Sequence, residues 1–95
     1  MKIVIVNTTH SNAPAGCWTG NPEHAKECDY LTEENNGEIK AIYEFSGVSD
    51  KDKDGKFNFK GLKEVTDPVV IGSIKSKVDI SRKRGEQQSL RYKEI

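Results

Sequence analysis

Long apolar stretches are scarce in this sequence of 95 residues. The longest run, Ile3 to Val6, has four residues, whereas a membrane-spanning helix needs roughly 20. Only these four apolar residues follow Lys2, so we predict no signal peptide. We therefore expect a cytoplasmic protein that makes no contact with a membrane.

Cysteines are also few. Cys17 and Cys28 cannot build a disulfide scaffold, and without an export signal we expect both to be reduced thiols. They share the segment 10–28 with His10 and His24, but no CxxC or HxxxH pair begins a zinc site there. We expect no metal and no other cofactor.

Signatures of catalysis are missing as well. The chain has no nucleophile elbow, and the glycines of Gly16–Gly20 are not followed by the Lys-Ser/Thr pair of a phosphate-binding loop. No family signature surrounds the cysteines and histidines. We expect a protein that is not an enzyme.

The composition fits one small domain spanning 1–95. Hydrophobic residues make up 34% of the chain and charged residues 32%, which leaves enough apolar surface for one thin core. The net charge is zero, but it is unevenly spread. Residues 1–37 carry two lysines against five acids, whereas residues 75–93 carry seven basic side chains against two acids. This basic segment permits contact with a polyanion such as DNA or RNA, and a solvated surface is the alternative.

Local patterns predict mostly short strands. Lys2–Asn7 is β-branched and apolar, and 38–45 and 56–60 alternate with period two, which places Ile39, Ala41, Tyr43 and Phe45 on one face. Asn36-Gly37 predicts a tight turn. We predict further strands at 28–32 and 89–93 and a loop at 8–20. A short helix is predicted at 21–27, where Asn21 would cap it and Pro22 would occupy its first position. A connection at 61–68 leads to a short apolar segment at 69–72, and a polar, basic stretch follows. The expected fold is β-rich α+β: a small, partly open barrel of five to six strands with one or two short helices.

The segment 50–61 resembles the calcium loop of EF-hand proteins. Asp50, Asp52 and Asp54 occupy alternate positions, Gly55 follows where the loop turns sharply, and Asn58 matches a later ligand position. However, Gly61 stands where the bidentate glutamate is needed, and the flanks have strand rather than helix periodicity. A hairpin turn is the main interpretation, and weak calcium binding remains the alternative.

Several motifs together resemble small bacterial domains with a PUA-like barrel, a class that includes the EVE and ASCH domains. The motifs are Gly16-Cys17-Trp18, Ala25–Leu31, Asn36–Phe45, Gly55–Gly61, Lys83-Arg84-Gly85 with Gln87 or Gln88, and Leu90-Arg91-Tyr92. Barrels of this kind commonly bind RNA or modified bases in DNA, and the resemblance implies a similar ligand here.

The predicted function is therefore a non-catalytic module that binds nucleic acid or a modified nucleotide. Trp18, on a loop between glycines, is the candidate for stacking on a base. Basic side chains of the C-terminal segment would hold phosphates. With Tyr92, the expected ligand-binding residues are Trp18, Lys75, Lys77, Arg82, Lys83, Arg84, Arg91 and Tyr92. Two alternatives stay open: Trp18 fills the core, and the chain is a small inhibitor or interaction domain whose partner is a protein.

Overall fold

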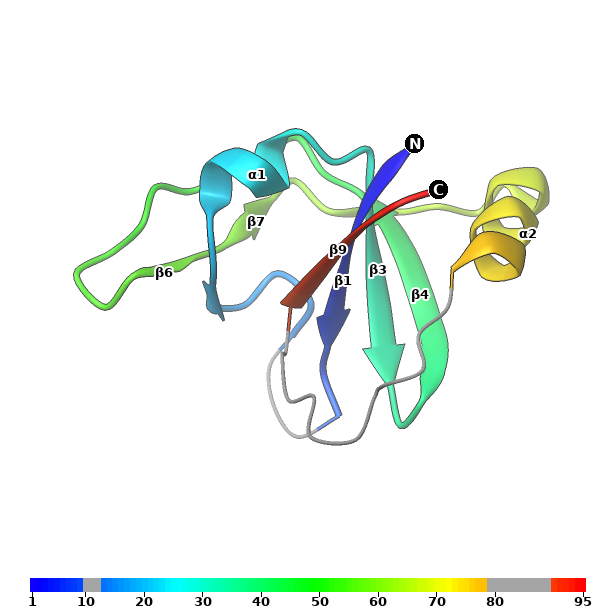
Figure 1. Cartoon of the computed structure of the whole chain (residues 1–95), viewed down its shortest axis with the longest axis horizontal. Coiled ribbons are helices and arrows are strands. Elements are labelled where there is room, and N and C mark those ends of the chain that lie inside the picture. The colour runs from blue at the N-terminus through cyan, green and yellow to red at the C-terminus, as the bar shows by residue number, and fades with distance from the viewer. Residues whose placement is uncertain (10–12, 79–89) are drawn as a thin grey trace.

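The computed structural model describes residues 1–9, 13–78 and 90–95, and one five-stranded sheet lies at its centre (Figure 1). Its strands stand in the order β8-β4-β3-β1-β9. They are β1 (Lys2–Asn7), β3 (Tyr30–Asn35), β4 (Glu38–Glu44), β8 (Lys63–Glu64) and β9 (Leu90–Glu94). β1 runs parallel to β3 and antiparallel to β9, so the two ends of the chain meet on neighbouring strands.

Two short ribbons and two helices complete the described structure. Strand β2 (Trp18–Thr19) pairs with β6 (Lys56–Phe57), and β5 (Gly47–Val48) pairs with β7 (Phe59–Lys60). The helices are α1 (Pro22–Lys26) and α2 (Pro68–Lys77). In Figure 1 α1 and the strands β6 and β7 lie to the left of the sheet, and α2 lies to its right.

Strand β1, between β3 and β9, is apolar because both of its faces are covered. Ile3 and Ile5 pack with Ile42 and with Ile74 of α2, and all four side chains are buried. Val4 and Val6 point to the opposite face, where they join a second cluster; its other buried members are Trp18, Ala25, Cys28, Leu31, Val48, Phe57 and Phe59. A strand buried on both faces loses the alternation of polar and apolar residues and becomes a continuous apolar run.

Several local predictions are confirmed. The first strand has the predicted bounds, and Asn21 caps α1 by accepting a hydrogen bond from the Glu23 N–H at 3.0 Å, with Pro22 in the first turn. Asn36 and Gly37 both have positive φ, 52° and 80°, as the tight turn requires.

The segment after residue 67 corrects a prediction. Helix α2 replaces the predicted short apolar segment at 69–72 and extends into the polar stretch. Asp67 begins it, since its carboxylate accepts a hydrogen bond from the Val69 N–H at 2.9 Å, and Pro68 occupies the first turn. The predicted strand 56–60 also divides at Asn58 into β6 and β7, which belong to different ribbons.

A β-bulge corrects the predicted faces of β4. Glu34 pairs with Ile39 and Glu33 pairs with Ala41, so Lys40 is an extra residue in β4. The extra residue reverses the alternation: Ile39 packs with the α2-side cluster, whereas Tyr43 packs on the opposite face. The four residues predicted to share one face are therefore split between two.

The β-rich α+β class is confirmed, but the sheet is not closed into a barrel. Within the described residues β8 and β9 stand at opposite edges of the five-stranded sheet, and the two ribbons are separate from it. In the same part of the chain no helix has the length and apolarity needed to cross a membrane.

Candidate functional site

The exposed stacking surface expected of Trp18 is not found. Its side chain is 3% exposed, lies in the cluster opposite α2, and pairs through β2 with Phe57. The indole N–H donates a hydrogen bond to the Pro14 carbonyl oxygen at 2.8 Å, which satisfies the one polar group of the ring. Trp18 therefore anchors its loop to the core, and a base cannot reach its ring.

Arg91, expected to hold a phosphate, is also buried. Its Nη2 lies 2.9 Å from Oε1 of Glu34, and both side chains are about 5% exposed or less. Arg91 is on β9 and Glu34 on β3, so the ion pair spans the intervening strand β1. A guanidinium held by a buried carboxylate is a structural element of the sheet rather than a surface cation.

Tyr92 lies next to Arg91 but on the opposite face, where it is half-buried. Its ring stacks on His24 of α1 with centroids 3.9 Å apart and planes 15° from parallel. Its hydroxyl donates a hydrogen bond to the Asn21 carbonyl oxygen at 3.2 Å. Burial raises the pKa of Tyr92 to about 12, with a smaller contribution from Cys28.

The remaining basic candidates divide into two groups. Lys75 and Lys77 are exposed in the last turn of α2, where cations complement the helix dipole. Neither forms an ion pair with any described residue. Arg82, Lys83 and Arg84 lie outside the described residues.

The segment 50–61 begins with a turn that leads into β6 and β7. The Asp52 carboxylate accepts hydrogen bonds from the backbone N–H groups of Asp54 at 2.8 Å and Lys56 at 3.0 Å. These bonds, the one from Lys56 foremost, lower the pKa of Asp52. The Asn58 N–H bonds to Ser49, and among the described residues no group of three or more His, Cys, Asp and Glu could hold a metal ion. Asp50 and Asp54 are exposed flanks of this turn.

The two cysteines lie in different environments. Cys17 is exposed, whereas Cys28 is buried and its thiol contacts the His24 carbonyl oxygen at 3.7 Å. Burial, the largest cause, raises the pKa of Cys28 to about 11, so its thiol stays protonated at neutral pH. His10 lies outside the described residues.

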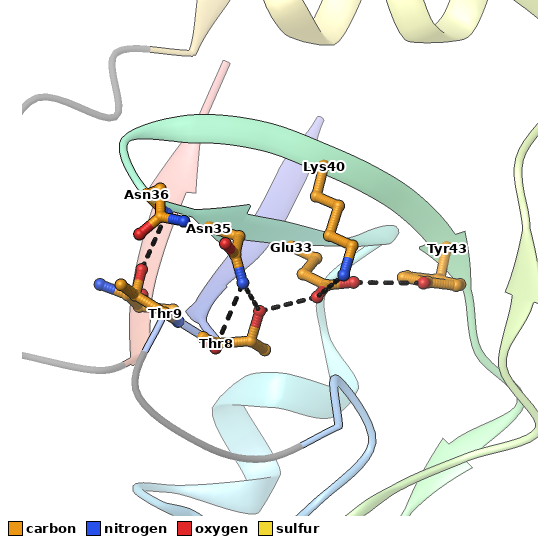
Figure 2. A network of polar contacts seen from close by, with 8 residues as sticks. Thr8, Thr9, Glu33, Asn35, Asn36, Lys40 and Tyr43 are labelled. Carbon is orange, nitrogen blue, oxygen red and sulfur yellow. Dashed lines mark hydrogen bonds and ion pairs between the residues drawn. The ribbon is translucent and has the colours of Figure 1, made fainter.

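A buried carboxylate that the sequence analysis did not single out lies within β3. Figure 2 shows Glu33 at the centre of a polar network. Its Oε2 accepts a hydrogen bond from the Thr8 hydroxyl at 2.7 Å, and its Oε1 accepts one from the Tyr43 hydroxyl at 3.2 Å. The ammonium group of Lys40, the extra residue of the bulge, lies 3.9 Å from Oε2 of Glu33. Burial and the Glu33 charge together raise the pKa of Tyr43.

The network continues into the β3–β4 turn. The Asn35 amide donates hydrogen bonds to the Thr8 hydroxyl at 3.1 Å and to the Thr8 carbonyl oxygen at 3.2 Å. The Asn36 N–H donates to the Thr9 hydroxyl at 2.9 Å (Figure 2). These bonds join the residues that follow β1 to the β3–β4 turn. Glu33, whose carboxylate bonds to Thr8, is 3% exposed.

Sequence reasoning missed Glu33, Glu34 and His24 for different reasons. From the sequence alone, Glu33-Glu34 is expected to be an exposed pair of acids at the end of a strand. Their burial becomes evident only from their partners, Thr8 for Glu33 and Arg91 for Glu34. The sequence offers His24 only as a candidate for a zinc or catalytic residue. Nothing in its sequence neighbourhood indicates contact with a tyrosine 68 positions away.

Comparison of the chain with protein-family models, with curated proteins and with solved structures finds no match in any of the three.

Proposed function

We propose that this chain is a non-catalytic module that binds single-stranded nucleic acid, with the phosphates held by basic side chains of the segment 75–93. The observation that carries the proposal is the exposure of Lys75 and Lys77, which form no ion pair with any described residue. Unpaired cations can neutralise phosphates and release counterions. The PUA-like resemblance of the sequence motifs supports the same class of ligand.

The structure changes the set of residues that we assign to this function. Arg91 is removed from the phosphate-binding set because Glu34 holds it inside the fold, and Trp18 is removed from the stacking set because it is buried. Of the seven basic residues of the segment, Lys75 and Lys77 keep their assignment, and Arg82, Lys83 and Arg84 lie outside the described residues. Lys93 is exposed on β9 and is a further candidate for phosphate contact.

Fluorescence anisotropy of a labelled 12-residue oligodeoxyadenylate tests the proposal. We expect saturable binding at about 25 mM salt that weakens as salt rises, because each phosphate contact on a single strand contributes about 0.7 to the slope of log K against log salt. Replacing both Lys75 and Lys77 with Gln should lower the slope by about 1.4.

A matched control uses two other exposed lysines. Lys51 and Lys53 lie in the turn beside Asp52, far along the chain from the basic segment, and changing both to Gln removes the same charge. The control should leave the slope unchanged. Equal slopes for both double variants, or no binding by the natural chain at 25 mM salt, would overturn the proposal.

A protein partner is the second candidate function. Val69 on α2 is 77% exposed, and Val70 and Ile71, which follow it in the helix, are only partly buried. Apolar side chains that remain accessible together are typical of interaction sites. Size-exclusion chromatography with light scattering, run with and without the oligonucleotide, distinguishes the two candidate functions. A protein partner is supported if the chain forms no complex with the oligonucleotide but self-associates or forms a protein complex, and if Val69→Ser abolishes that association.

A further inference from the structure

An exposed histidine lies flat on a tyrosine where α1 meets β9. The ring centroids of His24 and Tyr92 are 3.9 Å apart, and the planes differ by 15°. The phenol covers one face of the imidazole. His24 as a residue is exposed. The face of the imidazole turned away from Tyr92 is therefore the face of the stack on which a further ring could lie.

The lower ring of the stack is fixed. Tyr92 pairs with Val4 in the sheet, and its hydroxyl bonds to the Asn21 carbonyl oxygen at 3.2 Å. The phenol is thus tied both to the sheet and to the residue that caps α1.

The upper ring is positioned by the short helix that carries it. Asn21 caps α1, Pro22 occupies its first turn, and Ala25 is fully buried on its inner side. The His24 carbonyl oxygen also contacts the Cys28 thiol at 3.7 Å. A planar surface that is already ordered loses little conformational entropy when a ligand binds.

The charges around the stack are already paired. Lys26 lies 3.0 Å from Glu23, and Lys2 lies 3.7 Å from Glu27. No unpaired cation of α1 is therefore left for a phosphate. What remains for recognition is the planar surface of the ring, and aromatic side chains of this kind bind nucleobases by stacking without regard to sequence.

We propose that the outer face of His24, backed by Tyr92, is a stacking platform for an unpaired nucleobase of a single-stranded nucleic acid. This inference rests on the proposed function and gives it a base-binding residue in place of Trp18. The phosphate contacts and the base contact then come from different parts of the molecule. Loss of one should leave the other intact.

Two variants of His24 test the platform with the same oligodeoxyadenylate and with an abasic strand of equal length. His24→Ala removes the ring, and we expect affinity for the oligodeoxyadenylate to fall about 5- to 150-fold, which corresponds to the stacking energy of one base on an aromatic ring. His24→Phe keeps a planar ring and should retain affinity within about threefold. The salt slope should be unchanged in both, and thermal unfolding checks that each variant folds.

The abasic strand supplies the matched control on the ligand side. It should bind the natural chain as weakly as the oligodeoxyadenylate binds His24→Ala, and the substitution should not weaken it further. Equal affinity of the natural chain and His24→Ala for the oligodeoxyadenylate would overturn the platform.

Histidine ring signals in NMR spectra separate failure of the platform from failure of the proposed function. The chain has two histidines, so a His10→Gln variant assigns the signals. If neither strand binds at low salt, polymer binding fails, and adenosine alone is then titrated. A saturable shift of the His24 signal with adenosine supports the platform, whereas an unchanged signal overturns it.

Discussion

Arg91 and Glu34 form a buried ion pair that spans β1, with 2.9 Å between the guanidinium Nη2 and the carboxylate Oε1. The two residues are 57 positions apart, so the pair joins the last strand of the sheet to the third. The pair lies on the face of the sheet that α2 covers. Ile5 of β1 is on this face, and it pairs with Arg91 of β9 and with Thr32 of β3. The last strand thus contributes a buried ion pair as well as apolar contacts to the sheet.

Removing one partner of this pair should destabilise the fold strongly. We expect Arg91→Ala to lower the free energy of unfolding by about 3–5 kcal/mol, because it leaves the Glu34 charge buried without its guanidinium. Replacing both residues with Met should cost less than either single change, since neither member of the pair is then left buried without the other. Urea unfolding measures all three variants. A loss below about 1 kcal/mol for Arg91→Ala would show that the pair behaves like a surface salt bridge.

The Glu33 network predicts a ranking of two substitutions. Thr8→Val removes a 2.7 Å hydrogen bond to the buried carboxylate and the 3.1 Å bond that the Thr8 hydroxyl accepts from Asn35, whereas Tyr43→Phe removes only one longer bond of 3.2 Å. Bonds to charged groups contribute about 1.5–3 kcal/mol, so we expect a loss near the upper value for Thr8→Val and near the lower one for Tyr43→Phe.

Tyr30→Phe is the matched control, because the Tyr30 hydroxyl makes no hydrogen bond to a described residue. It should change stability by less than about 0.5 kcal/mol. The reverse ranking, or a control as costly as Tyr43→Phe, would contradict the role assigned to Glu33. Each free energy comes from urea unfolding at neutral pH.

Features that depend on neighbouring residues could be predicted from the sequence. The β-branched run predicts β1, the Asn-Pro pair predicts the start of α1, and Asn36-Gly37 predicts the tight turn, since each rests on local backbone preferences. Helix α2 escaped prediction because Val69, Val70 and Ile71 favour strands, although Asp67-Pro68 carries a helix-start signal. Packing of Ile74 against the sheet overrides the strand preference.

The candidate site was less predictable than the fold. The pairing of Arg91 with Glu34 and the stacking of Tyr92 on His24 join residues 57 and 68 positions apart, and no local pattern encodes them. The bulge at Lys40 also cannot be read from the alternation of β4, yet it turns a surface lysine toward Glu33. Long-range partners decide which charged residues are buried.

Stability should fall at alkaline pH. In the fold the pKa of Cys28 is raised from 9.0 to about 11 and that of Tyr92 from 10.0 to about 12, mainly by burial. The unfolded chain therefore loses these protons first as pH rises, so stability present below about pH 9 is lost between pH 9 and 12. Thermal unfolding at intervals of pH should show this decline. Cys28→Ala should flatten it between pH 9 and 11, whereas Cys17→Ala, at the exposed thiol, should not.

Two glycines with positive φ should respond differently to alanine. Gly37 has φ of 80° and no atom within 4 Å of an added Cβ, whereas Gly61 has φ of 66° and an added Cβ would overlap the Ser46 hydroxyl. Backbone strain alone should cost about 1–2 kcal/mol at Gly37, and overpacking should add about 1–3 kcal/mol at Gly61. Ser46→Gly removes the overlap, so it should recover part of the loss in Gly61→Ala and none in Gly37→Ala. Urea unfolding of the single and paired variants measures this coupling, and equal losses at the two glycines would show that Ser46 moves aside without cost.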